Sequence, residues 1–164
     1  MRSARIAVLA AGAGLALFAL AGCGSDKTHG SEGTLKLTEP GGKTGSFGVI
    51  GHPTRGKLSP GDGFAFSTPL QDSSKKTVGE LNAVCIGTQP SNPEALKGTC
   101  SATATVPGGD LALNAGGTVG NGVSGSIVGG TGKYAGATGT FSSKPTGGGG
   151  ENSPNTDTFS YTLP

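Results

Sequence analysis

Short runs of alternating apolar and polar residues, separated by glycine and proline, are the feature that most restricts the fold of this chain. The clearest run is Thr99–Val106, in which Cys100, Ala102, Ala104 and Val106 share one face and hydroxyl groups share the other. No stretch beyond residue 33 has a helical period, so such runs predict strands. The expected strands span residues 34–38, 46–50, 63–68, 78–87, 97–106, 110–115, 123–128, 137–143 and 158–163. Eight or nine strands without helices predict one all-β domain, an antiparallel sandwich or barrel.

Residues 1–22 have the pattern of a secretory signal peptide. Arg2 and Arg5 form a basic head, and the apolar run that follows, Ile6–Ala21, is shorter than the roughly 20 residues that a spanning helix needs. The alternative is a retained membrane-anchor helix.

The end of this segment, Leu20-Ala21-Gly22-Cys23, resembles the lipobox of bacterial lipoproteins. The resemblance implies cleavage before Cys23 and acylation of its thiol, with each buried methylene contributing about 0.8 kcal/mol to anchoring. We therefore expect a protein anchored through lipid on Cys23 at the extracytoplasmic face of the bacterial membrane. Residues 23–33 would form the lipidated cysteine and a flexible tether, and residues 34–164 the folded domain.

Net charge gives no support for nucleic-acid binding. The full chain carries +2, but without residues 1–22 it has ten basic and ten acidic side chains. Leu, Ile, Val and Phe number only 24 among the remaining 142 residues, a fraction at which disorder is an alternative, so folding has to be argued from the pattern.

Two cysteines remain after Cys23, and in a secreted chain Cys85 and Cys100 predict one disulfide. It would close a loop of about 15 residues and stabilise the fold by about 3 kcal/mol. A free thiol is the alternative. No metal or cofactor is expected, because no CxxC occurs and His29 and His52 are isolated.

A cross-strand disulfide also predicts which residues face the interior. Both sulfur atoms must lie on the same side, so one uncharged interior surface should contain Leu81, Ala83, Cys85, Cys100, Ala102, Ala104 and Val106. The same parity places Glu80 outside, and Lys36 and Asp110 also point away from their apolar neighbours. The interior is therefore expected to suit apolar contact rather than acid–base chemistry.

Residues 145–157 are expected to form a structureless loop before the final strand, in which Phe159, Tyr161 and Leu163 have one parity. Two glycine-rich segments, Gly120–Gly125 and Gly130–Ala135, fit nucleotide-binding fingerprints. Neither is followed by a helical pattern, so nucleotide binding is not expected.

The stretch Ile127–Phe141 resembles the signature of the allene oxide cyclase and dirigent superfamily. It has an apolar strand, the turn Gly129-Gly130-Thr131-Gly132, the aromatic Tyr134 and a segment of small residues. The resemblance implies a single antiparallel eight-stranded β-barrel. The motif is interpreted as a structural turn, with the Tyr134 ring over the barrel end. Plant members often carry Arg where this chain has Thr138, so no catalytic residue is carried over.

Three functions remain open for such a barrel. The first is binding of a small hydrophobic molecule. The second is a cyclase, isomerase or dirigent-like enzyme, which a desolvated carboxyl group aimed inward would favour. The third is a structural cell-envelope domain with a packed interior. Candidate ligand-binding residues are Phe64, Phe66, Leu81, Ala83, Ala102, Ala104, Leu111, Leu113 and Tyr134.

Overall fold

The computed structural model describes residues 30–42, 44–54, 57–89, 96–147 and 153–164. Its strands are β1 (Glu32–Glu39), β2 (Ser46–Ile50), β3 (Gly63–Gln71), β4 (Thr77–Gly87), β5 (Lys97–Val106), β6 (Gly109–Thr118), β7 (Gly122–Gly130), β8 (Thr138–Pro145) and β9 (Asn155–Thr162). Two short 3-10 turns, η2 (Val119–Asn121) and η3 (Gly132–Tyr134), flank β7. The predicted all-β class is confirmed.

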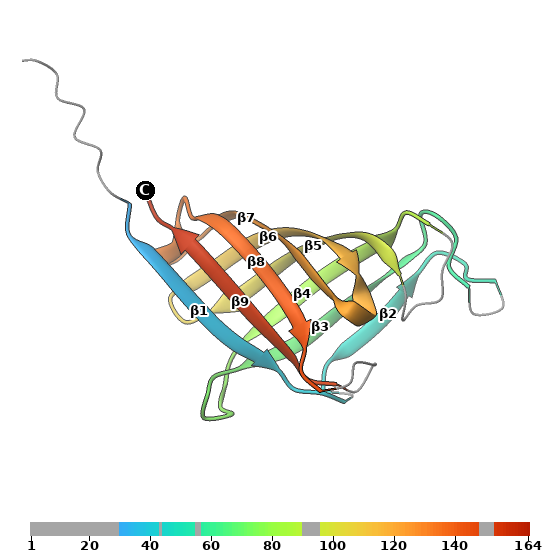
Figure 1. The fold of residues 1–164 in the computed structure, drawn as a ribbon, viewed down its shortest axis with the longest axis horizontal. Coiled ribbons are helices and arrows are strands. Elements are labelled where there is room, and N and C mark those ends of the chain that lie inside the picture. Colours follow the sequence, from blue (N-terminus) through green and yellow to red (C-terminus); the bar gives the residue numbers. More distant parts are fainter. Residues whose placement is uncertain (1–29, 43, 55–56, 90–95, 148–152) are drawn as a thin grey trace, which may run out of the picture.

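All nine strands form one antiparallel sheet that closes into a barrel (Figure 1). The order β1-β9-β8-β7-β6-β5-β4-β3 returns to β1 through the pair Thr38–Gln71. β2 pairs with the other part of β3, where Phe47 lies opposite Phe66. Because β1 and β2 occupy successive parts of one position beside β3, the barrel has eight strand positions. This confirms the expected antiparallel eight-stranded barrel.

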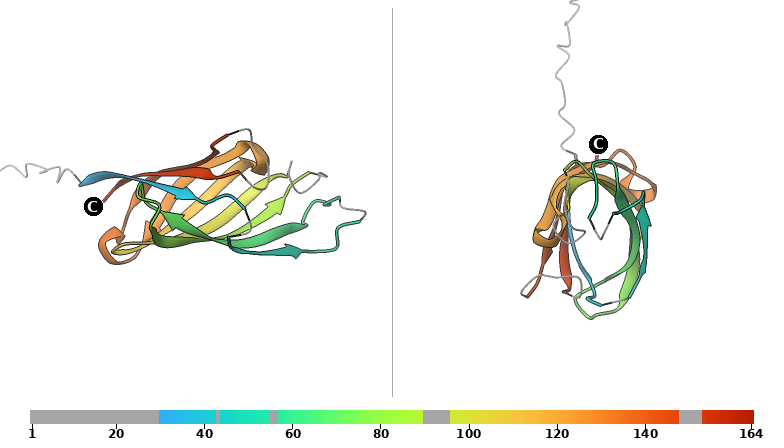
Figure 2. Two further views of the ribbon diagram at one scale, coloured as in Figure 1. Left: turned by 90° about the horizontal axis from the view of Figure 1, so that it is seen from below. Right: turned by 90° about the vertical axis from the view of Figure 1, so that its right-hand side faces the viewer.

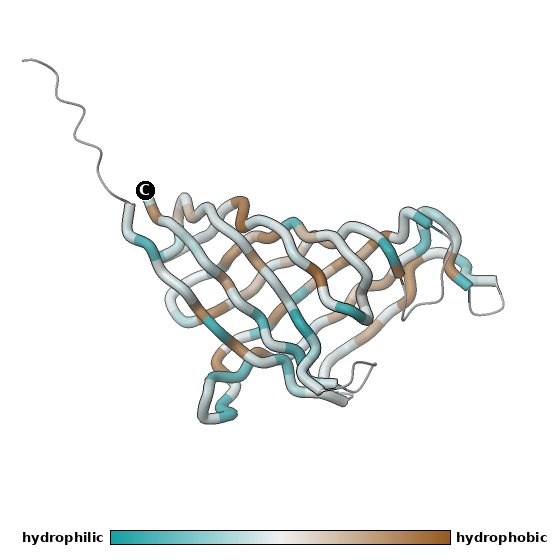
Figure 3. The backbone as a smooth tube through the Cα atoms, in the orientation of Figure 1, coloured by the Kyte–Doolittle hydropathy of each residue, from teal (hydrophilic) through white to brown (hydrophobic). Residues whose placement is uncertain are grey.

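The two ends of the barrel differ. The described chain begins and ends at the same end, which we call the terminal end (Figure 1). The opposite end, which we call the β2 end, carries β2 and the connection that follows it (Figure 2). In Figure 3 apolar and polar residues alternate along the strands, as expected when one face of each strand lies inside.

The main hydrophobic cluster extends to the terminal end of the barrel. Tyr134 in η3 is buried there, with its ring centroid 5.3 Å from that of Tyr161 in an edge-on arrangement, and its hydroxyl donates a hydrogen bond to the Pro107 carbonyl at 3.5 Å. The cluster comprises Leu37, Leu70, Leu81, Ala104, Val106, Leu111, Leu113, Ile127, Tyr134, Ala137, Phe141 and Phe159. The inner face is therefore densely packed at this end.

A second, smaller cluster lies toward the β2 end and contains the disulfide. Cys85 of β4 is directly opposite Cys100 of β5, and the two are bonded, as predicted. Leu58, Phe64 and Leu96 pack around them. The inward parity inferred from the disulfide also holds, because Leu81 and Ala83 are buried whereas Glu80 is exposed.

The glycine motif forms the turn between β7 and β8. Gly132 has a φ of +57°, and a Cβ there would lie 2.2 Å from the carbonyl oxygen of Gly108. The Lys133 amide donates a hydrogen bond to the same oxygen at 2.8 Å. Only glycine fits this close backbone approach, which positions the Tyr134 ring in the barrel end.

The bounds predicted for the loop over residues 145–157 are wrong at both ends. Pro145 belongs to β8, and β9 begins at Asn155, three residues earlier than expected. The Thr146 amide donates to the Pro154 carbonyl at 2.7 Å, which continues the contact between the two strands. Residues 148–152 lie outside the described part of the chain.

The signal peptide over residues 1–22 and the lipidation of Cys23 also concern residues outside the described ranges. Among the residues that the structure describes, no helix has the length and apolar character needed to cross a membrane.

Candidate functional site

Two carboxyl groups lie inside the barrel, contrary to the expectation of an interior without acid–base groups. Glu39, at the end of β1, is 8% exposed, and Asp157, in β9, is 0% exposed. Asp157 is flanked in the sheet by Leu37 of β1 and Ser143 of β8, and both neighbours are buried. Glu39 follows Leu37 by two positions, so its side chain is on the same inward face. We call Glu39 and Asp157 the acid pair.

The acid pair has few hydrogen-bond partners. The Ser143 hydroxyl donates to Glu39 Oε1 at 3.3 Å. Both carboxyl oxygens of Asp157 are buried, and neither has a hydrogen-bond partner in the described part of the protein. A buried polar group without a partner costs about 1–3 kcal/mol, and such groups are often functional.

Burial and proximity change the protonation of the acid pair. Burial and the negative charge of Glu39 raise the pKa of Asp157 from its ordinary value of 3.8 to about 8. Burial also raises the pKa of Glu39. Asp157 is therefore protonated at neutral pH, and the pair can donate a proton or a hydrogen bond inside the barrel.

Two apolar residues of β2 are incompletely covered, in contrast to the buried cluster around the disulfide. Phe47 and Val49 of β2 lie opposite Phe66 and Phe64 of β3, so they share the inner face of the sheet. Even so, Phe47 is 63% and Val49 is 52% exposed. The Phe47 and Phe64 rings stack with centroids 5.3 Å apart, and Phe66 follows at 6.0 Å from Phe64. We call these four residues the apolar mouth.

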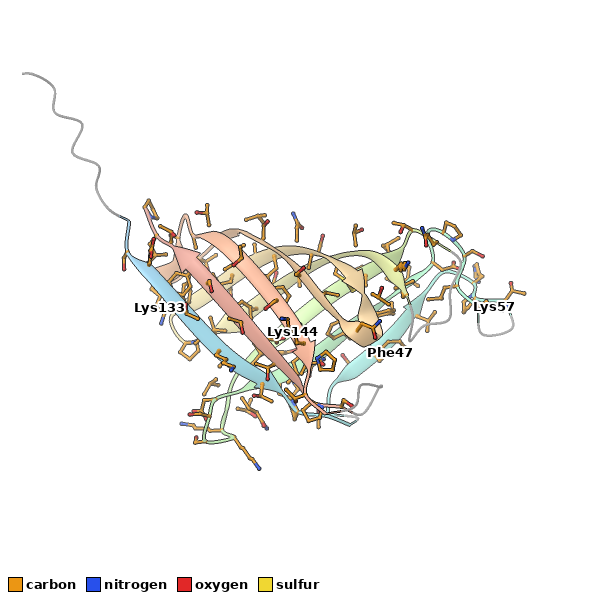
Figure 4. All side chains as sticks on the ribbon, in the orientation of Figure 1. Phe47, Lys57, Lys133 and Lys144 are labelled. Atoms are coloured by element: carbon orange, nitrogen blue, oxygen red, sulfur yellow. A yellow bond between two sulfur atoms is a disulfide. The ribbon has the colours of Figure 1, made fainter. Side chains whose placement is uncertain are left out.

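Small residues line the part of the inner face between the apolar mouth and the packed cluster. Ala102 of β5 and Ala115 of β6 face inward but are only half-buried, as are Phe66 and Val123. Farther along the same strands Ala104 and Leu111 are wholly buried. Solvent therefore reaches the inner face beside Ala102 and Ala115 but not beside Ala104 and Leu111. Figure 4 shows Phe47 and Lys133 at these two ends.

The nine predicted ligand-binding residues divide between these regions. Five of them belong to the packed main cluster: Leu81, Ala104, Leu111, Leu113 and Tyr134. Phe64 is buried beside the disulfide. The remaining three, Phe66, Ala83 and Ala102, follow one another across β3, β4 and β5, and lead from the apolar mouth into the barrel wall.

A surface groove lies on the other side of this wall. It has a volume of about 700 Å³ and takes three successive residues from each of β2, β3, β4 and β5. The outer two of each triplet face the exterior: Ser46, Gly48, Ala65, Ser67, Asn82, Val84, Ser101 and Thr103. The second groove, of about 410 Å³, crosses β1 and β9 near Glu32. Neither includes the acid pair.

Sequence reasoning missed the acid pair, although a signal was present. The parity of Phe159, Tyr161 and Leu163, extended back by two residues, places Asp157 on the inner face. The parity of Leu35 and Leu37, extended forward by two, does the same for Glu39. Both residues lay just beyond the expected strand ends.

The comparisons with known proteins show a shared fold. No family model matches the sequence, and no curated protein matches it. Among solved structures, the pterocarpan synthase dirigent protein GePTS1 is 20% identical with a TM-score of 0.63, over 83% of this chain and 91% of that chain. The Diels Alderase AbmU from Streptomyces koyangensis is 17% identical with a TM-score of 0.61, over 81% of this chain and 64% of that chain.

A pyocyanin demethylase is 20% identical with a TM-score of 0.58, over 76% of this chain and 97% of that chain. The chain thus has the barrel fold of dirigent and cyclase-like proteins. This agrees with the fold that the resemblance of Ile127–Phe141 implied.

Proposed function

We propose that the barrel binds a small, largely apolar molecule at the apolar mouth. The observation that carries this proposal is the exposure of Phe47 and Val49 on the inner face of the sheet. Full burial of a side chain of this kind is worth about 1.5–3 kcal/mol, so an apolar ligand that covers both would gain affinity. The ligand would extend over the small, partly solvent-accessible residues Ala102 and Ala115 on the inner face.

The names of the structural neighbours are consistent with this class of ligand. They describe a pterocarpan synthase, a Diels Alderase and a pyocyanin demethylase, which act on small organic molecules. At 16–20% identity the likeness supports the shape of the binding site rather than the identity of its ligand.

The test is fluorescence of the apolar probe N-phenyl-1-naphthylamine with the domain of residues 24–164, together with native mass spectrometry for a co-purifying molecule. Val49→Ser should weaken probe binding several-fold. Val128→Ser is the matched control, because Val128 is 54% exposed but lies on β7, away from the mouth. Equal effects of the two substitutions, or no binding at all, would overturn the proposal and favour a structural cell-envelope domain.

The acid pair favours a second candidate, an enzyme that cyclises or isomerises the bound molecule. A protonated Asp157 can supply a proton to a developing negative charge, and Glu39 can accept one, while the apolar walls hold a single conformation. Chromatography of the co-purifying ligand after incubation with the protein tests this function. Asp157→Asn should abolish conversion, and equal conversion by this variant would exclude the role.

We also propose that the mature protein is a lipoprotein anchored at the extracytoplasmic face of the membrane through Cys23. The support is the sequence of residues 1–23. Cell fractionation of a Cys23→Ala variant tests it: the variant should be soluble or unprocessed, and mass spectrometry of the wild-type N-terminal peptide should show added acyl chains. Unchanged membrane retention of the variant would contradict the anchor.

A further inference from the structure

We infer that the acid pair recognises a cationic nitrogen, so that the ligand of the barrel is an apolar molecule that carries a protonated amine. This inference rests on the proposed apolar binding site and adds the chemical class of its ligand. The two carboxyl groups would contact the amine, and the apolar mouth would contact the hydrocarbon part.

The first argument is that the acid pair has no protein counter-ion among the described residues. Of the charged side chains on β1, Glu32 and Lys36 are exposed and only Glu39 is inside. On β8 the single charged residue is Lys144, which is exposed, and β3 carries none. On β9 itself the only charged residue is Asp157. In the part of the chain that the structure describes, the two buried acids therefore have no cation beside them.

The second argument is the unused hydrogen-bonding capacity. In the described part of the protein neither oxygen of Asp157 accepts a hydrogen bond, and Glu39 accepts one from the Ser143 hydroxyl at 3.3 Å, so the main partner of each carboxyl group is the other one. An alkylammonium group has up to three N–H donors, and its hydrogen bonds to carboxylates are roughly twice as strong as neutral ones. Glu39 retains a small exposed part, so it would contact the ligand first and Asp157 would lie behind it.

The third argument is the distance from the apolar mouth. Thr38 pairs with Gln71, which places Glu39 beside Leu70, the next residue in the antiparallel register. Phe66 is four residues from Leu70 on the same inward face of β3, about 13 Å along the strand. A glutamate and a phenylalanine side chain can each cover part of this separation, which leaves a length that an aromatic or alicyclic body with a short aminomethyl arm can span.

The fourth argument concerns protons. Without a bound cation Asp157 is protonated at neutral pH, because burial and the Glu39 charge raise its pKa to about 8. A bound ammonium ion would favour the ionised pair, so a proton should leave the acid pair for the solvent when the amine binds. The O–H bond of the Asp157 carboxyl group breaks and a buffer base accepts the proton, whereas the ligand keeps its own proton and no covalent bond joins it to the protein.

The test compares three probes with the same ring system: 1-naphthylmethylamine, 1-naphthylmethanol and 1-naphthoate. Calorimetry at pH 7.5 with the domain of residues 24–164 should give affinities in the order amine, alcohol, carboxylate. The amine should exceed the alcohol by tenfold or more. Titrations of the amine in phosphate and in Tris should differ in heat, because a proton is released.

Glu39→Gln and Asp157→Asn should each bring the ratio of amine to alcohol affinity close to one. Glu80→Gln, which removes an exposed carboxyl group from the exterior of β4, should leave the ratio unchanged. Thermal unfolding of each variant establishes that it is folded. If the amine and the alcohol bind equally to the wild type, the inference is wrong and the apolar site stands. If no probe binds, both fail.

Discussion

We expect the stability of this barrel to depend on pH between pH 5 and pH 8, and replacing Asp157 with Asn should remove most of that dependence. The pKa of Asp157 is about 8 in the folded protein and close to its ordinary 3.8 in the unfolded chain. Between these values the folded state holds a proton that the unfolded state has released. Its contribution to stability is thus fully present below about pH 4 and is lost as the pH rises through 8.

The size of the effect follows from the separation of the two pKa values. One proton changes the free energy of unfolding by about 1.4 kcal/mol per pH unit, so four units correspond to at most about 6 kcal/mol. Domains of this size are stable by about 5–15 kcal/mol, so the wild type should weaken markedly at alkaline pH. Asn has nearly the same shape and does not titrate. The variant should therefore be more stable than the wild type at pH 8.5, by several kcal/mol.

Urea unfolding at half-unit intervals from pH 5 to pH 9, followed by circular dichroism, measures this difference. Glu39 titrates in the same direction because burial raises its pKa, so the double substitution with Glu39→Gln should give the flattest profile. Glu80→Gln is the control on the exterior, with an unchanged profile. Parallel wild-type and Asp157→Asn profiles would refute the reasoning, because the buried carboxyl group would then not hold a proton.

Three further predictions concern the fold. Replacing Cys85 and Cys100 with Ser should lower the free energy of unfolding by about 3 kcal/mol in urea titrations, because the disulfide closes a loop of 15 residues; an unchanged midpoint would contradict this. Phe159→Ala should lower the free energy of unfolding by about 3–5 kcal/mol, because the ring is wholly buried and its centroid is 5.1 Å from that of a second phenyl ring. A decrease below 1 kcal/mol would show that the cluster is loosely packed. Gly132→Ala should lower the melting temperature, because the added Cβ would lie 2.2 Å from a carbonyl oxygen. Gly129→Ala is the control and should leave the melting temperature unchanged, because a Cβ at that position has open space around it. Equal shifts for the two variants would argue against the close turn.

The strands were predictable because their side chains alternate between two environments. Thr99–Val106 is a case in which a single period-two run fixes both the strand and its inward face, and the disulfide extends that parity to β4. The turn around Gly132 was equally readable, since only glycine tolerates its backbone. Local sequence sufficed wherever a residue's environment depends on its own strand.

The acid pair was not predictable in the same way. Glu39 and Asp157 are polar residues at strand ends, next to Pro40 in one case and to a polar loop in the other, so their composition indicates solvent. Their burial depends on the closure of the barrel, which brings β1 against β9. Pairing between the first and last strands gives Glu39 and Asp157 neighbours from a strand that is distant in the sequence. Local sequence patterns do not contain this information.

The pairing of β1 with β9 also determines when the acid pair can form. Most of the other strand pairs join neighbours in the chain, whereas the contact of Ser143 with Glu39 spans 104 residues. Contacts of such long range form late in folding, because the loop-closure entropy has to be overcome first. The first strand to be synthesised, β1, therefore keeps an unpaired edge until the last strand, β9, is available. A ligand that binds at the acid pair would bind only the closed barrel. It would therefore stabilise the pairing between the first and last strands of this chain.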